Sequence, residues 1–285
     1  VDINLKSKFD DNYFSGNVNG LISDTPIIAD EFHILKNNNT YIIPTLDLQI
    51  GDSYNKFSFN YINRNKFNIF GNLSNLDINY LKFINKHLNR LDGLISNSEF
   101  IISNNGYKYP IIMLNTKILN GNIDEVEFEN VDLSVSYRNN RFLINFLDLE
   151  TEFGELQLNG WIHQNNDEIT LANNKMNLNL IYDNIDIIKF NRYFPFSYEV
   201  RGLVSGNIDI SGSMYDPIIK SNINIASPGF DKINANSLSS NIYYSNYRLD
   251  FKHLNIGTTH GTFYGNGFMP INFTNNEINI FDKPI

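Results

Sequence analysis

The sequence has no cysteine, only eight prolines, and charged side chains at just 19% of its 285 positions. The missing cysteine excludes disulfide frameworks, iron–sulfur clusters, thiol nucleophiles and zinc sites built on thiolates. A chain of this length buries enough surface to fold without such cross-links. The formal net charge of −9 argues against a dedicated nucleic-acid-binding protein, because such a protein needs a concentrated basic surface.

Long apolar runs are also missing. No stretch approaches the roughly 18 consecutive apolar residues that a membrane-spanning helix requires. The sequence starts at Val1 inside an alternating pattern, without a signal peptide, and ends at Ile285 without a lipidation motif. We therefore expect it to be part of a longer protein, with any membrane anchor outside this segment.

Asparagine and isoleucine are far more abundant than in most proteins. Most of the chain alternates between apolar and polar residues, as in residues 131–137, which is typical of strands with one apolar and one solvated face. Asn-rich turns such as 104–106 and 139–140 separate these runs and indicate hairpins. The pattern predicts an all-β chain of antiparallel meanders.

Two short segments break the alternation. Leu81, Ile84 and Leu88 have helical spacing within residues 78–91, and residues 187–193 have the length of about two turns. The sequence therefore predicts two short helical links.

An internal repeat is visible when the chain is aligned with itself so that Pro110 meets Pro217, an offset of 107. Residues 110–162 then align without a gap with residues 217–269, matching Gly154 with Gly261. Apolar positions in one segment align with apolar positions in the other. A slip of one residue would exchange the two faces of a strand, so this match means that the apolar face itself is repeated.

A second alignment, at an offset of 89, matches Phe57 and Gly71 with Phe146 and Gly160, which predicts an earlier partial copy. Together the offsets predict three units in one continuous elongated domain: a partial unit at residues 1–75, a second at 76–183 and a third at 184–285.

The third unit carries family-like motifs. Glycines space a strand from Gly202 to Gly212, Asp216 and Pro217 form a turn into the next strand, and residues 265–270 read Gly-Asn-Gly-Phe-Met-Pro. In these motifs the chain resembles the repeated block of TamB and its AsmA-like relatives. The resemblance covers residues 185–273 well and residues 76–162 in part, and it rests on periodicity before residue 76.

The resemblance implies a fold and a function. The fold is an elongated, repetitive antiparallel sheet curled into an open trough, a β-taco, with an apolar lumen. Such proteins lie in the periplasm of diderm bacteria and are anchored in the inner membrane. They are implicated in moving phospholipids between the inner and outer membranes, or in assembling outer-membrane proteins with the barrel protein TamA. The resemblance thus predicts a non-enzymatic segment that contacts phospholipid acyl chains and a TamA-type barrel, without cofactor, metal or nucleic acid.

The alternation selects the residues that we expect to line the lipid groove: Val131, Leu133, Val135, Phe142, Ile144, Leu156, Leu158, Leu178, Leu180, Ile208, Ile210, Ile223, Ile225, Phe251 and Phe263. Glycines within strand patterns usually mark bulges or bends. We expect bends that curl the sheet at Gly71, Gly160, Gly206, Gly212, Gly267 and Pro217.

Catalytic motifs find little support. Ser205 lies in a Gly202–Gly206 segment that is superficially similar to a nucleophile elbow, but its context is strand to strand. The five histidines lack metal-ligand spacing.

Two other interpretations remain open. The apolar residues could pack into a closed sandwich core without ligand, as in a structural or adhesive extracellular β-repeat protein. Alternatively, the sheet could offer an edge to the strands of outer-membrane proteins as an assembly scaffold.

Overall fold

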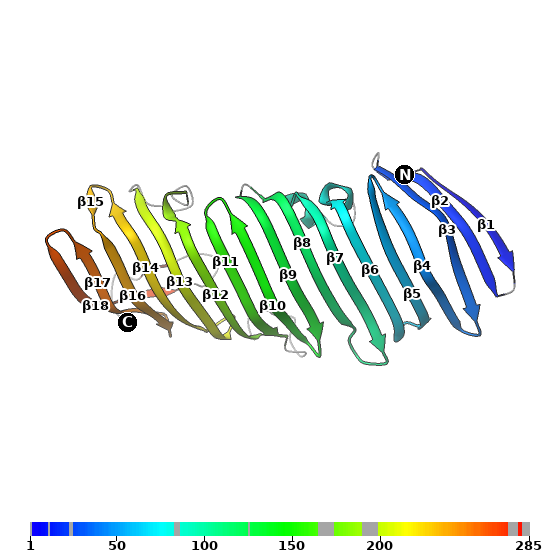
Figure 1. The fold of residues 1–285 in the computed structure, drawn as a ribbon. Coiled ribbons are helices and arrows are strands. Elements are labelled where there is room, and N and C mark those ends of the chain that lie inside the picture. Colours follow the sequence, from blue (N-terminus) through cyan, green and yellow to red (C-terminus); the bar gives the residue numbers. More distant parts are fainter. Residues whose placement is uncertain are drawn as a thin grey trace. The chain divides into compact units, whose positions relative to one another are not determined.

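The computed structural model describes residues 2–10, 12–22, 25–82, 86–124, 126–164, 174–189, 199–272 and 279–280. These residues form antiparallel β-strands with a few short helical turns (Figure 1), which confirms the all-β class. The chain forms two compact units, Val1–Glu152 and Phe153–Ile285. The three repeat units predicted above stay a prediction, and each compact unit is described by itself.

In its described residues, the first unit is a ten-stranded antiparallel meander in which each strand pairs with the next. Its strands are β1 (Asp2–Asp10), β2 (Tyr13–Ile22), β3 (Thr25–Asn37), β4 (Thr40–Ile50), β5 (Ser53–Asn63), β6 (Lys66–Asp77), β7 (Leu94–Asn105), β8 (Ile111–Ile123), β9 (Val126–Arg138) and β10 (Arg141–Thr151).

The second unit continues the same architecture. Its strands are β11 (Gly154–His163), β12 (Lys175–Asp186), β13 (Val200–Ser213), β14 (Pro217–Phe230), β15 (Ile233–Asn234), β16 (Ser237–Ser245), β17 (Arg248–Thr258), β18 (Gly261–Asn272) and β19 (Asn279–Ile280). Pairing follows chain order, except that β14 pairs with both β15 and β16. Among the described residues, the sheet is open rather than closed into a barrel.

The segment between β6 and β7 contains two 3₁₀ helices, η1 (Ile78–Leu81) and η2 (Lys86–Arg90). The side chain of Asp77 accepts a hydrogen bond of 2.8 Å from the Asn79 N–H and so begins η1. Such short segments favour the tighter i→i+3 bonds over an α-helix.

The second predicted link begins in the same way, because the Asp186 side chain accepts a hydrogen bond of 3.1 Å from the Ile188 N–H. Residues 187–189 form a 3₁₀ turn, and residues 190–193 lie outside the described residues. No α-helix is present in the part of the chain that the structure describes, so neither predicted link is shown as a regular helix.

The sequence repeat is also a backbone repeat. Positive φ angles occur at Asn120, Asp124, Asn139 and Asn140, and again at their repeat equivalents Ser227, Asp231, Asn246 and Tyr247. The N–H of Asp124 donates to the Arg90 carbonyl at 2.7 Å, and the N–H of Asp231 donates to the Glu199 carbonyl at 3.0 Å. The chain therefore repeats the conformation of its turns as well as its strand pattern.

The earlier copy aligns at an offset that the sequence did not reveal. β3 and β4 begin at Thr25 and Thr40, and β9 and β10 begin at Val126 and Arg141, an offset of 101 in both cases. The offset of 89 relates β5 to β10, which are five strands apart, whereas the offset of 107 relates β10 to β17 over a full repeat. Only the offset of 101 matches β4 with β10, the strand that the offset of 107 matches with β17.

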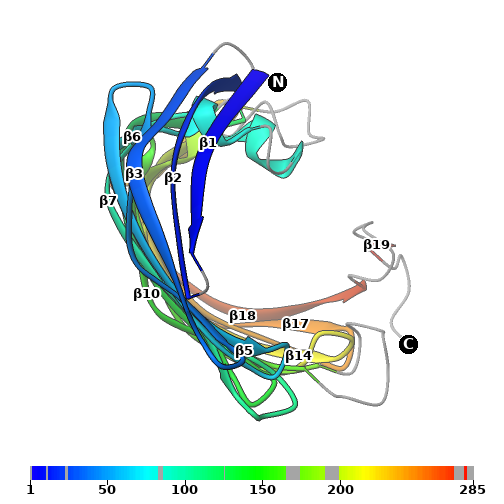
Figure 2. The same ribbon diagram turned by 90° about the vertical axis from the view of Figure 1, so that its right-hand side faces the viewer.

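These three equivalent strands share a bulge. The register shifts after Ile43 in β4, after Ile144 in β10 and after Phe251 in β17. A bulge bends its strand and increases the local twist. Figure 2 shows strands of the first unit bent along their length.

Positive φ angles also place asparagine in the left-handed region within strands. Asn75 of β6 and Asn184 of β12 both have φ of 52°, and Asn120 of β8 has φ of 48°. Asparagine tolerates this region better than most residues, because its short polar side chain interacts with the local backbone. Part of the asparagine richness therefore serves the bulges and turns.

We predict that Asn120→Val lowers the free energy of unfolding by about 1–3 kcal/mol, because a β-branched residue is strained at positive φ. Asn120→Gly should be close to neutral, since glycine adopts this region without steric cost. Asn68→Val, at an exposed Asn in a regular part of β6, is the matched control and should cost nothing. Urea unfolding measures all three; equal stability of the two Asn120 variants would contradict the role of the positive φ.

Candidate functional site

The apolar side chains of the first unit form rows across its strands. Directly paired residues of antiparallel strands lie on the same face of a sheet. One row runs from β5 to β10 through Phe59, Ile69, Ile102, Ile112, Tyr137 and Phe142. The adjacent row contains Phe57, Gly71, Phe100, Leu114, Val135 and Ile144. The face is thus continuous over six strands.

One end of this apolar face is covered. Leu76 is 0% exposed and belongs to a buried cluster formed by Ile50, Leu76, Ile78, Ile95, Ile118, Phe128 and Val131. Tyr80 and Leu81 of η1 pack against this cluster. Figure 2 shows the helical turns (cyan) on the concave side of the bent strands.

The remainder of the face is not covered in this way. The two rows beyond the cluster are mostly half-buried, and Ile112 and Phe142 are 38% and 39% exposed. Their in-plane neighbours hide part of each side chain, but a second packed layer would bury them as fully as Leu76. The first unit therefore has a small closed core at one end and an open apolar surface beside it.

The second unit repeats the arrangement. One row contains Leu158, Leu180, Ile208, Ser221, Ile242, Phe251 and Gly267. The next contains Gly160, Leu178, Ile210, Ile219, Tyr244, Leu249 and Met269. Among the described residues of these two rows, Tyr244 alone is buried, and the others are half-buried or exposed.

The register locates each residue expected to line a groove. Val131, Leu133, Val135, Phe142 and Ile144 lie on the apolar face of the first unit. The other ten share one face of the second unit: Leu156, Leu158, Leu178, Leu180, Ile208, Ile210, Ile223, Ile225, Phe251 and Phe263. Val131 belongs to the closed core, so it is the least available to a ligand. Contact with lipid remains a prediction for the whole set.

The residues expected to line the groove did not include the equivalent residues of β5 to β8. Phe57, Phe59 and Ile69 continue the rows, and the alternation at residues 57–61 and 67–69 was the signal that could have identified them.

The glycines expected at bends have different surroundings. Gly160 and Gly212 have φ of 134° and 95°, which side chains rarely adopt. A Cβ on Gly71 would clash with the Phe100 ring, and one on Gly206 would clash with the Asn222 carbonyl. Gly267 has open space around it, and Pro217 begins β14. Whether these residues bend the sheet remains a prediction.

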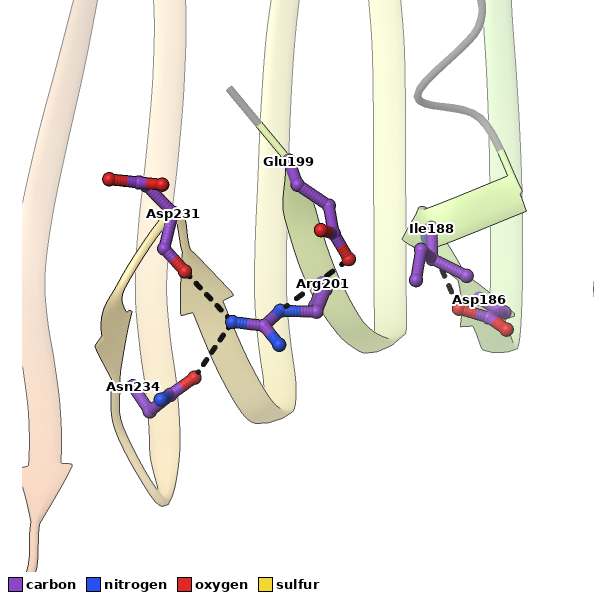
Figure 3. Close-up of polar contacts among 6 residues, drawn as sticks. All are labelled: Asp186, Ile188, Glu199, Arg201, Asp231 and Asn234. Atoms are coloured by element: carbon purple, nitrogen blue, oxygen red, sulfur yellow. Dashed lines mark hydrogen bonds and ion pairs between the residues drawn. The ribbon is translucent and has the colours of Figure 1, made fainter.

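Polar contacts secure the ends of the strands rather than a reaction centre. Figure 3 shows the Arg201 side chain reaching from β13 to the β14–β15 turn. Its Nη2 donates to the Asp231 carbonyl at 2.9 Å and to Asn234 Oδ1 at 3.2 Å, and its Nε lies 3.9 Å from Glu199 Oε1. At the equivalent turn of the first unit, Arg90 Nε lies 2.7 Å from Asp124 Oδ1. Arg90 corresponds to Glu199 and not to Arg201, so each turn is held by an arginine from a different position.

Ser205 also has a structural role. Its hydroxyl donates to Asp183 Oδ1 at 2.6 Å and accepts from the Asn184 N–H at 2.9 Å. Both partners belong to the bulge of β12, so Ser205 holds the bulge against β13.

Two tyrosines of the second unit have raised pKa values. Burial, followed by the charges of Tyr247 and Asp216, raises the pKa of Tyr244. A side-chain hydrogen bond with Tyr215 is the largest cause that raises the pKa of Tyr247. Both phenols therefore stay neutral at physiological pH. Within the described ranges, no three acidic or histidine side chains cluster closely enough to hold a metal ion, and no helix is long and apolar enough to cross a membrane.

We predict that Leu76→Ala costs about 2–5 kcal/mol of stability, as for other fully buried leucines. Leu114→Ala, on the half-buried row of the same sheet, should cost clearly less, because solvent already reaches its side chain. Urea unfolding of the two matched variants measures the difference. Equal losses would show that the open rows are packed like a core.

Comparison with known proteins adds no identification. No family model, curated protein or solved structure matches this chain.

Proposed function

We propose that this chain is a segment of a TamB- or AsmA-like bridge that conducts phospholipids along a hydrophobic groove. The observation that carries the proposal is the apolar face described above, which is repeated with constant parity and is largely uncovered in each unit. Soluble proteins seldom expose contiguous apolar patches larger than a few hundred Å² without a function for them.

The dimensions of the face suit acyl chains. Six strands at a spacing of about 4.8 Å give each row of the first unit a length of roughly 25–30 Å across the strands. This is similar to the hydrocarbon thickness of a membrane. Moving one CH₂ group of a lipid tail into water costs about 0.8 kcal/mol. A tail on this face is therefore held against escape into water, whereas movement along the rows exchanges one apolar contact for another.

The uncovered rows favour an open trough over a closed, dry core. In a closed sandwich, Ile112 and Phe142 would be buried against a second sheet, yet they are more than one-third exposed. In the proposed protein the concave face is the wall of a lumen, and the 3₁₀ helices close one side of it.

The family resemblance supplies the remainder of the proposal. The glycine-spaced strand from Gly202 to Gly212 and the Asp216-Pro217 turn support membership of the TamB/AsmA-like group. On that basis the segment is non-enzymatic and periplasmic, belongs to a protein anchored in the inner membrane, and acts with a TamA-type barrel in the outer membrane.

We predict that a photoreactive residue at Ile210 or Phe251 crosslinks to phospholipid acyl chains. Both positions lie on the apolar face of the second unit. Asp209 is the matched control, because it neighbours Ile210 in β13 but lies on the polar face. Mass spectrometry of the adducts identifies the lipid. If positions 210 and 251 stay free of lipid, or position 209 labels equally, the groove is not a lipid path.

We also predict that Ile210→Asp abolishes lipid binding while the protein stays folded, because this position is not enclosed by a second packed layer. Ser211→Asp adds the same charge to the other face and should leave lipid binding unchanged. Circular dichroism measures folding, and the lipid content after incubation with phosphatidylethanolamine vesicles measures binding. Global unfolding of Ile210→Asp would instead indicate a closed core.

A further inference from the structure

Charge is distributed unevenly along the strands of the first unit. Four consecutive hairpins, from β3–β4 to β9–β10, turn at the same edge of the sheet, which is the lower edge of this unit in Figure 1. The tips of these hairpins are residues 33–44, 60–70, 100–113 and 134–147, and they contain no Asp or Glu. Their Lys and Arg residues are Lys36, Arg64, Lys66, Lys108, Arg138 and Arg141. We call these four tips the basic edge.

The opposite edge of the first unit has a different charge pattern. Asp52 lies there in the β4–β5 turn. Lys82, at the end of η1, forms an ion pair with Asp92. Arg90, at the end of η2, forms an ion pair with Asp124. Cations of this edge are thus matched by carboxylates, whereas the tips of the basic edge contain cations without any carboxylate.

Three cations of the basic edge come from two adjacent turns. Arg64 and Lys66 belong to the β5–β6 turn and Lys108 to the β7–β8 turn, and all three residues are exposed. The two turns lie side by side, because the Gly106 N–H donates a hydrogen bond of 2.7 Å to the Asn65 carbonyl. In the part of the chain that the structure describes, no ion pair involves these three cations. They form a local cluster of positive charge.

The conformation of these turns does not depend on the cations. The Asn63 side chain accepts a hydrogen bond of 2.9 Å from a backbone N–H of the β5–β6 turn. The Asn104 side chain accepts hydrogen bonds of 3.0 and 2.9 Å from two backbone N–H groups of the β7–β8 turn. At the repeat offset of 107, Tyr215 takes the place of Lys108. The repeated fold therefore does not require a cation at this turn, and the positive charge is available for binding.

The apolar face of the first unit reaches the basic edge. Phe67 directly follows Lys66 and pairs with Tyr61 of β5. The rings of Tyr61 and Phe59 are stacked, with centroids 5.9 Å apart. Tyrosine suits such a boundary, because its ring is apolar and its hydroxyl is polar. An apolar tail on this face would therefore end beside the cations.

We propose that the basic edge binds the phosphate group of an anionic phospholipid whose tails lie on the apolar face of the first unit. Arg64, Lys66 and Lys108 hold the phosphate, since both side-chain types donate charge-assisted hydrogen bonds to phosphate oxygens. The carboxylates of the opposite edge repel the same headgroup, so the lipid takes one orientation across the sheet. The proposal rests on the lipid groove proposed above and adds the headgroup class and the side of the groove at which it lies.

The test is lipid uptake by the full chain from vesicles of phosphatidylglycerol or phosphatidylcholine with identical tails. Phosphatidylcholine carries the same phosphate, but its trimethylammonium group compensates the charge. We expect uptake of phosphatidylglycerol to be at least about fivefold higher at low ionic strength, the factor that corresponds to about one cation near an anionic surface. The preference should disappear at about 1 M salt, where charges are screened within about 3 Å. Mass spectrometry of the purified protein measures the bound lipid.

A variant that combines Arg64→Gln, Lys66→Gln and Lys108→Gln should lose this preference and still take up phosphatidylcholine as the native chain does, because its apolar face is unchanged. Circular dichroism confirms that the variant folds. A second variant that combines Arg64→Lys with Lys108→Arg keeps the charges and should keep the preference.

The matched control combines Lys117→Gln, Lys220→Gln and Lys232→Gln, which remove the same charge from exposed positions away from the basic edge. It should keep the preference. A further arm adds inorganic phosphate at about 1 mM, against chloride of equal ionic strength. It should leave the preference unchanged, because exposed cations alone bind a free anion weakly and the tails supply most of the binding.

The outcomes separate the two proposals. Equal uptake of the two lipids by the native chain, a preference that survives in the Gln variant of the basic edge, or a preference lost in the control variant would overturn the headgroup site and leave the groove standing. Loss of the preference with inorganic phosphate would show a site for free anions and would also overturn it. Uptake of neither lipid would overturn the proposed groove and the headgroup site together.

Discussion

The structure depends on one constraint: every strand must keep its apolar side chains on the same face although bulges interrupt the ladder. Across the bulge of β12, Tyr182 pairs with Gly206 and Ile185 pairs with Val204. Between these two pairs, β12 has one residue more than its partner strand β13. Asn184 takes up the difference at positive φ, so Tyr182 and Ile185 stay on one face. Without this device the apolar rows would cross to the polar side.

A bulged single-layer sheet has two consequences. Its strands bend, and the 3₁₀ helices that follow β6 cover one end of the apolar face of the first unit around Leu76 and Ile78. The other rows stay half-exposed, which is costly for a structural protein but useful for one that must contact mobile apolar ligands. The repeat then supplies the same surface again in the second unit.

The sequence predicted which residues of each strand share a face, because the alternation of apolar and polar residues is a local signal. The same signal selected Leu178, Ile210 and Phe251, and the register later placed them on one face. It did not predict the positive φ angles within strands, because Asn75 and Asn120 look like any other polar residues of the solvated face. It also predicted a short helical link at residues 78–91, where the structure has two 3₁₀ helices, the first of them capped by Asp77. Whether a face is covered depends on how a following segment folds back over several strands, as η1 does over Leu76 and Ile118, so the alternation alone could not separate this core from the open rows.

The central claim is that acyl chains lie on the apolar face and not on the polar one. Trp161 is the single tryptophan of the chain and lies on the opposite face from Gly160 and Ile162. A variant that combines Trp161→Phe with Phe251→Trp moves this fluorophore to the apolar face. Short-range quenching by phospholipids with brominated tails measures the contact directly. The account predicts strong quenching at position 251 and weak quenching of the native Trp161; equal quenching at both, or none at position 251, would contradict it.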